Sequence, residues 1–286
     1  MTSSVEARVE SALGRSSTCE LAMGPPERPV VTPVTPLFDP ERGTIVVTSP
    51  PAYAEKVTAM RTHPQVALRL YQAKEPIEVH GRASVREDDP FDGAAELRSL
   101  IFDGPDTPKR RVMESMQEAL ETGAAHYLMD WYRLRIVVDI EPDAVRDLDD
   151  VKMASVSPWP SVGIDEREGA SYERVLLGTV EDGQPTTRAV TDLVIDGGDA
   201  LLTCAGEPPV GQPACLLCHW HTFDLDDLEQ RVIRGRLLQD GRFRPASSFH
   251  LRNETTFDAL RFVLGGKRRT RKALGVRNPL RWTWDV

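Results

Sequence analysis

Two halves of the chain repeat the same order of short β-type segments, and this repeat constrains the fold more than any other feature. The segments RPVVTPVTPL, GTIVVTS, PQVALRLY and EVHGRAS recur as QPTTRAVTDL, DALLTCA, PACLLCHW and VIRGRLL. The matched pairs are Pro29 with Pro185, Val34 with Val190, Thr48 with Thr203, Leu68 with Leu217 and Gly81 with Gly235. Because a recurring order of segments is the signature of a duplicated unit, we predict two related domains, 1–150 and 151–286.

The repeated segments alternate with Pro, Gly and acidic turn residues, as strands of an antiparallel sheet do. Helices are expected at 4–13, at 51–63 before Pro64, at 90–102 and at 108–123, with a strand at 132–142. The offset between the copies shrinks after Thr48, so the second copy has lost most of the helix that carries Lys56. The expected fold class is mainly β with flanking helices (α+β).

Composition excludes several classes of protein. The 286 residues are 40% hydrophobic and 28% charged, values typical of globular domains. A net charge of −9 makes a nucleic-acid partner unlikely, since phosphate contacts require basic surface. No apolar run is long enough to cross a membrane and the start of the chain does not look like an export signal, so a cytoplasmic location with reduced cysteines is expected.

The first half resembles the pyridoxamine 5′-phosphate oxidase-like FMN-binding split-barrel family. The resemblance rests on RPVVTPVTPLF, a β segment ending in VVTS, the helix in AEKVTAMRTHPQVAL, and IEVHGRASV, and it extends more weakly to 170–250 through the repeat. It implies tandem FMN-binding split barrels that form an internal pseudo-dimer, with flavin at their junction. A small-molecule substrate and an electron donor are also implied, and a further homodimer is left open.

The resemblance also implies which positions hold the flavin. The strand at 29–34 would run beside the isoalloxazine ring, Thr48 and Ser49 would contact the phosphate end, and Lys56 would neutralise it. The cofactor-binding residues carried over are Pro29, Val31, Thr32, Pro33, Val34, Thr48, Ser49 and Lys56.

The chemistry of these residues supports the assignment separately. A phosphate group requires a cation together with hydroxyl or amide donors near a helix start, and TSPPAYAEK supplies them. Prolines 29, 33 and 36 remove backbone donors and favour an irregular or edge strand. A solvated Lys56 and a simple strand-end turn at Thr48 and Ser49 remain alternative interpretations.

The second copy departs from this pattern, because it has Arg188 where the first has Thr32 and it lacks a counterpart of Lys56. One flavin site per chain is therefore expected. The substrate-binding residues of true pyridoxamine phosphate oxidases have no clear match, so vitamin B6 oxidation is not favoured. No catalytic residues can be assigned, since flavin itself carries the electrons.

The stretch ACLLCHWH contains the C-x-x-C-H pattern of covalent haem attachment. As the counterpart of VALRLYQ it is a strand, so Cys215, Leu217, His219 and His221 share one face and Leu216, Cys218 and Trp220 the other. The two sulfurs then point to opposite faces, which argues against covalent haem and structural zinc, and no metal site is predicted. Two interpretations of Cys215, His219 and His221 stay open. They are a partial metal site or polar lining toward the barrel junction, or they are a buried thiol and a pair of histidines with satisfied hydrogen bonds.

Three further features leave alternatives open. RFRPASSFH (242–250) is either a polar loop that closes the second barrel or a contact for phosphate or substrate. The segment 261–281 has eight basic residues and no acid, and reads as a solvated helix face or a phosphate or acidic-partner surface. Trp282 and Trp284 either close the chain end or touch the ring.

These observations favour an FMN-binding oxidoreductase of the split-barrel family. The alternatives are a non-catalytic flavin or haem binding module, with haem held non-covalently, and a reductase that uses a deazaflavin coenzyme. A nucleic-acid or regulatory partner acting through 261–281 is a third class.

Overall fold

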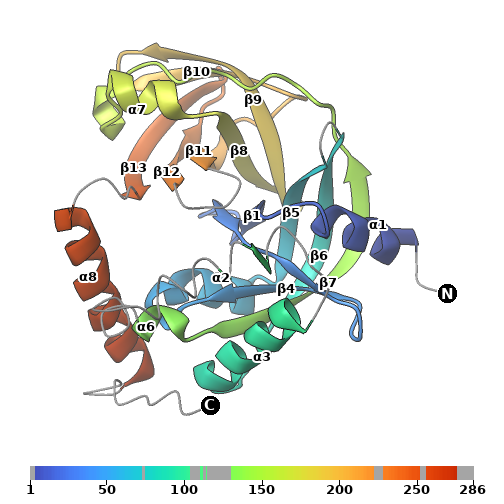
Figure 1. Cartoon of the computed structure of the whole chain (residues 1–286). Coiled ribbons are helices and arrows are strands. Elements are labelled where there is room, and N and C mark those ends of the chain that lie inside the picture. Colours follow the sequence, from blue (N-terminus) through green and yellow to red (C-terminus); the bar gives the residue numbers. More distant parts are fainter. Residues whose placement is uncertain are drawn as a thin grey trace.

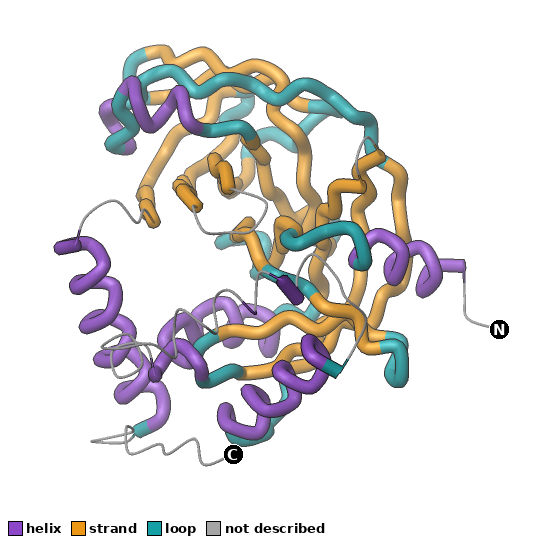
Figure 2. The backbone as a smooth tube through the Cα atoms, in the orientation of Figure 1, coloured by secondary structure: helices purple, strands orange, loops and turns teal. Residues whose placement is uncertain are grey.

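The computed structural model contains two curled antiparallel β sheets, one in each half of the chain (Figure 1). It describes residues 4–72, 75–103, 110–111, 114, 130–221, 228–251 and 256–275. In Figure 2 strands form most of both halves, and helices lie around the outside of the first. The fold is mainly β with flanking helices, as the sequence predicts.

The first sheet has the strand order β2-β1-β5-β6-β7-β4-β3, and all its neighbours are antiparallel. Its strands are β1 (Cys19–Met23), β2 (Val30–Val34), β3 (Leu37–Asp39), β4 (Thr44–Ser49), β5 (Gln65–Gln72), β6 (Glu75–Val85) and β7 (Ile136–Asp147). The chain passes from β2 into β3 through Thr35 and Pro36, so the two ends of this sheet are consecutive in sequence. This curled sheet is open between β2 and β3, and we refer to it as the first barrel.

The second sheet is a closed barrel of order β10-β13-β12-β11-β8-β9. Its strands are β8 (Arg174–Glu181), β9 (Gln184–Asp196), β10 (Asp199–Cys204), β11 (Gln212–His221), β12 (Leu228–Leu237) and β13 (Arg242–Leu251). Matching β8 to β1, β9 to β2 plus β3, and β10 to β4 gives both barrels the same strand order. The predicted repeat is therefore present in the topology of the chain itself.

A β-bulge recurs at the same place in both barrels. The register of β6 against β7 shifts between His80 and Gly81, and that of β12 against β13 shifts between Arg234 and Gly235. A Cβ atom on Gly81 would lie 2.4 Å from the Glu141 carbonyl oxygen, and one on Gly235 would lie 2.2 Å from that of Arg244. Each bulge therefore requires glycine, because the neighbouring backbone approaches too closely for any side chain.

The strand register corrects one detail of the sequence alignment. Leu21 pairs with Leu68 in the first barrel, and its counterpart Leu177 pairs with Leu216 in the second. Leu68 therefore corresponds to Leu216 and not to Leu217. The slip of one residue matters, since it exchanges the inner and outer faces of a strand.

Helices flank the first barrel. They are α1 (Ser4–Leu13), the 3₁₀ turn η1 (Pro51–Tyr53), α2 (Ala54–Thr62), α3 (Pro90–Phe102) and α6 (Asp130–Arg133). The second barrel carries η2 (Pro160–Val162) and α7 (Glu166–Ser171), and α8 (Thr256–Leu274) follows it.

The predicted helices at 4–13, 51–63 and 90–102 are confirmed, and the loop between β10 and β11 replaces α2 in the second barrel. The strand expected from 132 begins only at Ile136, because α6 precedes it. Most of the predicted helix at 108–123 lies outside the described residues. No helix among the described residues is long and apolar enough to span a membrane.

Each barrel has its own core, and a third cluster joins them. Leu68 and Leu70 belong to the first core, and Leu216 and Cys218 to the second. The joining cluster consists of Ala22, Val31, Ala67, Leu176, Ala189, Cys215, Leu217 and Val232. The barrels thus contact each other through the outer faces of β1, β2 and β5 and of their counterparts β8, β9 and β11.

Candidate functional site

The contact between the barrels has two sides that are related by the repeat. On one side β2 packs against β8, β11 and β12 of the second barrel, and on the other β9 packs against β1 and β5 of the first. We refer to them as the β2 side and the β9 side. The predicted cofactor residues all belong to the β2 side or to the elements that follow it.

On the β2 side the contact is apolar and tight. Val31 is fully buried, and a Cβ atom on Gly178 would lie 2.1 Å from its Cγ2 atom. Val232 of β12 completes this contact. The side chain of Val31 therefore holds the two barrels together and is not available to a ligand.

The other residues predicted on this strand lie around Val31. Pro29 and Val34 are buried, whereas Thr32 and Pro33 are half-buried. The strand β2 pairs only with β1, so it is an edge of the hydrogen-bonded sheet, as its prolines predict. Thr32 and Pro33 are the two predicted positions on β2 with side chains partly accessible to a bound ring.

The end of β4 and the start of α2 bring Thr48, Ser49 and Lys56 to one end of the barrel. Thr48 is half-buried, but Ser49 is 1% exposed and its hydroxyl lies 3.4 Å from the Tyr53 carbonyl oxygen, to which it donates. Ser49 therefore fixes the turn into α2, while its hydroxyl oxygen keeps its acceptor capacity. No side chain caps the start of α2, which directly follows the 3₁₀ turn η1.

Lys56 is the most unusual residue of this group. It is partly buried, and among the described residues no carboxylate lies within ion-pair distance of it. Burial and the positive charge of Arg135 together lower the pKa of Lys56 to about 8. A lysine in this environment gains stability when an anion binds beside it.

Sequence reasoning missed Arg234, which the second barrel contributes to the β2 side. Its guanidinium lies 3.9 Å from Glu55 of α2, and its Nε atom is buried without a hydrogen-bond partner. Arg28, beside the predicted strand, also approaches Glu55 at 3.8 Å. The aligned repeat gives no signal for Arg234, because its counterpart in the first barrel is His80.

The β9 side has the opposite character. Here Glu78 occupies the place of Val232, and its fully buried carboxylate accepts hydrogen bonds from the backbone N–H and hydroxyl of Thr187 at 2.8 and 2.6 Å. His80 and Arg146 bind its other oxygen at 3.0 and 2.6 Å. An anionic carboxylate is thus built into this side of the contact.

Arg188, the counterpart of Thr32, does not supply a free cation on the β9 side. Its guanidinium forms an ion pair with Glu181, lowering the pKa of that carboxyl to about 2. Cys204 stands where the first barrel has Ser49, and no helix follows it. The β9 side therefore lacks the hydroxyl and the unpaired lysine of the β2 side.

The C-x-x-C-H stretch is strand β11, and its side chains alternate as predicted. Cys215 and Leu217 belong to the cluster between the barrels, whereas Leu216, Cys218 and Trp220 contact the core of the second barrel. Burial raises the pKa of Cys215 to about 11 and that of Cys218 to about 12. The two thiols are separated by the sheet and remain protonated at neutral pH.

His219 and His221 line the junction between the barrels, which is one of the interpretations that the sequence leaves open for them. The Nε2 atom of His219 lies 3.0 Å from the carboxylate of Glu20 on β1, and both side chains are fully buried. Arg174 donates to the same carboxylate at 3.0 Å. Burial alone would raise the pKa of Glu20, but His219, Arg174 and Arg69 outweigh it and hold that pKa below its ordinary value.

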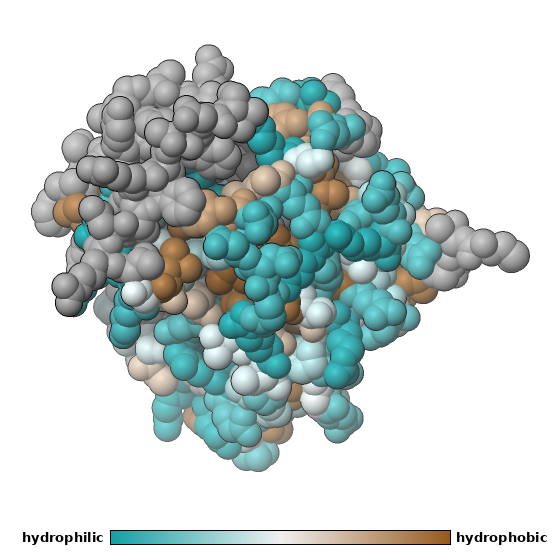
Figure 3. Space-filling model, turned by 90° about the horizontal axis from the view of Figure 1, so that it is seen from below, coloured by the Kyte–Doolittle hydropathy of each residue, from teal (hydrophilic) through white to brown (hydrophobic). Residues whose placement is uncertain are grey.

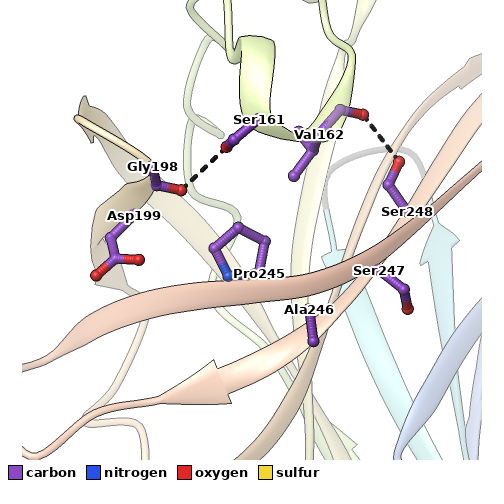
Figure 4. A pocket seen from close by; sticks show the side chains of 8 residues that line it. All are labelled: Ser161, Val162, Gly198, Asp199, Pro245, Ala246, Ser247 and Ser248. Carbon is purple, nitrogen blue, oxygen red and sulfur yellow. Dashed lines mark hydrogen bonds between the residues drawn. The ribbon is translucent and has the colours of Figure 1, made fainter.

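Residues 242–250 form strand β13, so the reading of this stretch as a loop is wrong. Its Arg244 pairs with Asp199 at 2.9 Å, and its Ser247 and Ser248 line a pocket of about 260 Å³ on the second barrel. Figure 4 shows Ser248 directed to Val162 and Ser161 directed to Gly198 across this pocket. Its lining comes from η2, β13 and the turn before β10, away from Lys56.

One group of potential metal ligands occurs in the described part of the chain, at Glu168, Glu229 and His250. The Nε and Nη2 atoms of Arg231 donate to the carboxylate of Glu168, and Glu229 lies 3.0 Å from His250. This arrangement is a satisfied ion-pair network and offers no free ligand set.

Comparison of the chain with known proteins gives matches among solved structures. No family model and no curated protein matches the chain. The chain is similar in structure to a pyridoxamine 5′-phosphate oxidase-related, FMN binding protein from Nostoc punctiforme, with 13% identity over 66% of this chain and 99% of that one and a TM-score of 0.35. It is also similar to general stress protein 26 from Bacillus anthracis, with 16% identity over 51% of this chain and 94% of that one and a TM-score of 0.33.

A protein of the NimC/NimA family from Clostridium acetobutylicum is another solved structure of this kind. Its identity is 15% over 50% of this chain and 92% of that one, with a TM-score of 0.33. Because these TM-scores are low, we derive the fold from the strand order and register of the chain itself. In that sense the chain is a tandem of two antiparallel split barrels, the fold that the resemblance implies.

Proposed function

We propose that the protein is an FMN-binding oxidoreductase that passes electrons or hydride through one flavin per chain to a small molecule. The flavin lies on the β2 side, with Thr32 and Pro33 beside the ring and with Thr48, Ser49 and Lys56 at the phosphate end. The observation that carries the proposal is Lys56, a partly buried lysine without a carboxylate partner in the described residues.

The residues present fit a flavin phosphate. A phosphomonoester carries a charge near −2 at neutral pH and accepts several hydrogen bonds. Lys56 supplies a cation and Thr48 a hydroxyl, both close to the start of α2. When bound, the flavin would supply the redox chemistry, and the protein would hold and orient it.

The experiment is a titration of the purified full chain with FMN and with riboflavin, followed by quenching of flavin fluorescence. The proposal predicts micromolar or tighter binding of FMN and binding of riboflavin at least tenfold weaker, because riboflavin lacks the phosphate. Equal affinities would contradict the phosphate assignment, and no binding of either would contradict the flavin site.

The coenzyme and the activity need separate tests. Competition between FMN and a deazaflavin coenzyme distinguishes the two cofactors, and a Soret band on addition of haem would favour a haem module. Reduction of bound FMN by NADH or NADPH at a rate well above that of free FMN supports an oxidoreductase. Absence of reduction by these and other donors would favour a non-catalytic flavin-binding module.

A further inference from the structure

The C-terminal helix α8 packs against the elements that carry Lys56. It contacts η1 and α6, and Figure 1 shows it running beside α6 at the edge of the first barrel. Gly266 makes this approach possible, since a Cβ atom on it would lie 2.1 Å from the Trp131 ring. The position of α8 along its own axis is therefore fixed next to α6.

Aromatic side chains connect α8 to the start of α2. The Trp131 ring lies 6.3 Å from that of Tyr53 and 5.4 Å from that of Phe262 of α8, measured between centroids. The guanidinium of Arg269, also on α8, lies 5.3 Å from the centre of the Tyr53 ring. Tyr53 is three residues before Lys56, so Arg269 lies at the same end of α2 as Lys56.

Arg135 adds a third cation from the opposite direction. It lies between α6 and β7, is 9% exposed, and its guanidinium stacks on the Tyr132 ring at 4.4 Å. Its Nη1 atom donates only to the backbone carbonyls of Tyr132 and Leu134. Its positive charge is close enough to Lys56 to contribute to the lowered pKa of that lysine.

None of the three cations has a carboxylate partner among the described residues. Elsewhere in the described chain several buried or half-buried arginines are paired with a carboxylate, as Arg86 is with Asp139 and Arg231 with Glu168. A buried or half-buried cation without a counter-charge is stabilised when an anion binds beside it, and Lys56 and Arg135 are two such cations. Within the part of the chain that the structure describes, no anion accompanies them or the exposed Arg269.

We propose that Arg269 and Arg135 complete an anion site with Lys56, and that α8 acts as the wall of this site. Its ligand is a phosphate group, and under the proposed function, on which this identification rests, it is the terminal phosphate of the flavin. The seven-residue segment between β10 and β11 replaces α2 in the second barrel, so the repeat provides no second site of this kind.

The test compares Arg269→Gln with Arg268→Gln in the full chain. Both residues are exposed on the same helix, so their substitution changes the net charge equally, but only Arg269 stacks on Tyr53. We expect Arg269→Gln to weaken FMN binding at least tenfold and to leave riboflavin binding unchanged. Arg268→Gln is expected to change FMN binding by less than twofold.

Two further variants protect the test against indirect effects. Arg135→Gln should also weaken FMN more than riboflavin, but Arg135 is buried and this variant could fail to fold. Gly266→Ala keeps every charge and displaces α8 from Trp131, so it should reproduce the selective loss of FMN affinity. Unchanged FMN affinity in both Arg269→Gln and Gly266→Ala would overturn the inference while leaving the flavin site intact.

If the wild-type protein binds neither FMN nor riboflavin, inorganic pyrophosphate serves as the probe that tests whether Arg269 belongs to an anion site. The inference predicts that millimolar pyrophosphate raises the melting temperature of the wild-type protein and of Arg268→Gln, but not that of Arg269→Gln. Equal shifts in all three proteins, or no shift in the wild type, would show that Arg269 belongs to no anion site.

Discussion

The two sides of the contact between the barrels have the same strands in the same order, yet they carry different charged groups. The β2 side presents Lys56 and Arg234, whereas the β9 side contains the buried carboxylate of Glu78. Val232 stands on the β2 side where Glu78 stands on the β9 side, as the matching register of the two barrels shows. This difference is the reason why we propose one anion site per chain and not two.

The difference shows how little of a barrel must change to remove a site. The strand pairing and the bulge at Gly81 and Gly235 are retained in the second barrel. What changes is one helix and a few side chains, including Thr32 to Arg188. Fold and site are therefore specified by different residues of the same strands.

The largest expected effect concerns the buried carboxylate of Glu20 on β1, which lies where this strand meets the second barrel. Glu20→Ala would leave Arg69, Arg174 and His219 without their shared carboxylate in a buried place. We expect a loss of about 3–5 kcal/mol in the free energy of unfolding, measured by urea denaturation. Glu55→Ala, at an exposed carboxylate, is the control and should cost less than about 1 kcal/mol.

The comparison of the two sides is tested directly by Lys56→Met and Arg188→Met. Loss of Lys56 removes a charge-assisted contact to phosphate, so FMN affinity should fall about 100-fold. Arg188→Met alters the β9 side and should leave FMN affinity within about twofold. An equal loss in both variants, measured by flavin fluorescence, would mean that the two sides share the ligand.

The repeat itself is tested by Gly81→Ala and Gly235→Ala. In both variants the added Cβ atom would meet a backbone carbonyl oxygen of the neighbouring strand, at 2.4 and 2.2 Å. Each should lower the free energy of unfolding by more than about 1 kcal/mol. Gly198→Ala, where no atom lies within 4 Å of the added Cβ, should be nearly neutral. A neutral result at only one of the two bulges would show that the barrels are not equivalent there.

The smallest expected effect is a dependence on pH caused by Lys56. Its pKa of about 8 lies below the ordinary 10.5, because the side chain is partly buried and because the positive charge of Arg135 acts on it. Between these values the unfolded chain binds more protons than the folded one, so the stability contribution of Lys56 rises with pH from about 8 to 10.5. Thermal melts of the flavin-free protein should show this rise, and Lys56→Met should lack it.

A bound phosphate would raise the pKa of Lys56. FMN affinity is therefore expected to fall with rising pH, whereas the stability of the flavin-free protein rises. Above pH 8 the free protein loses the proton that the complex retains, so FMN affinity should fall by up to about tenfold per pH unit. Riboflavin affinity should not follow this fall. A flat FMN profile between pH 7 and 9.5 would contradict a phosphate beside Lys56.

Most of the fold could be predicted from the sequence, because period-two patterns and turn residues are local signals that recur in both halves. The one-residue error at Leu68 arose because PQVALRLY and PACLLCHW align equally well by eye, and only the strand register separates Leu216 from Leu217. The alternation of Cys215 and Cys218 was predictable, since it follows from strand geometry alone.

The partners of the candidate site were less predictable. Arg234, Arg135 and Arg269 come from elements distant in sequence from Lys56, so nothing local connects them with it. The unpaired state of Lys56 is likewise a property of tertiary packing. The reading of 242–250 as a loop was wrong because its serines and arginines are turn-like in composition, whereas strand β13 has mostly exposed side chains. The place of Trp282 and Trp284 stays a prediction, since both lie outside the described residues.

The most direct test of this account is the number of flavin molecules bound per chain. Titrate the wild-type protein with FMN at a protein concentration well above the dissociation constant, and read the end point from the visible spectrum. The charge difference between the two sides predicts an end point of one FMN per chain, abolished by Lys56→Met and retained in Arg188→Met. An end point of two, or of one that survives Lys56→Met, would contradict it.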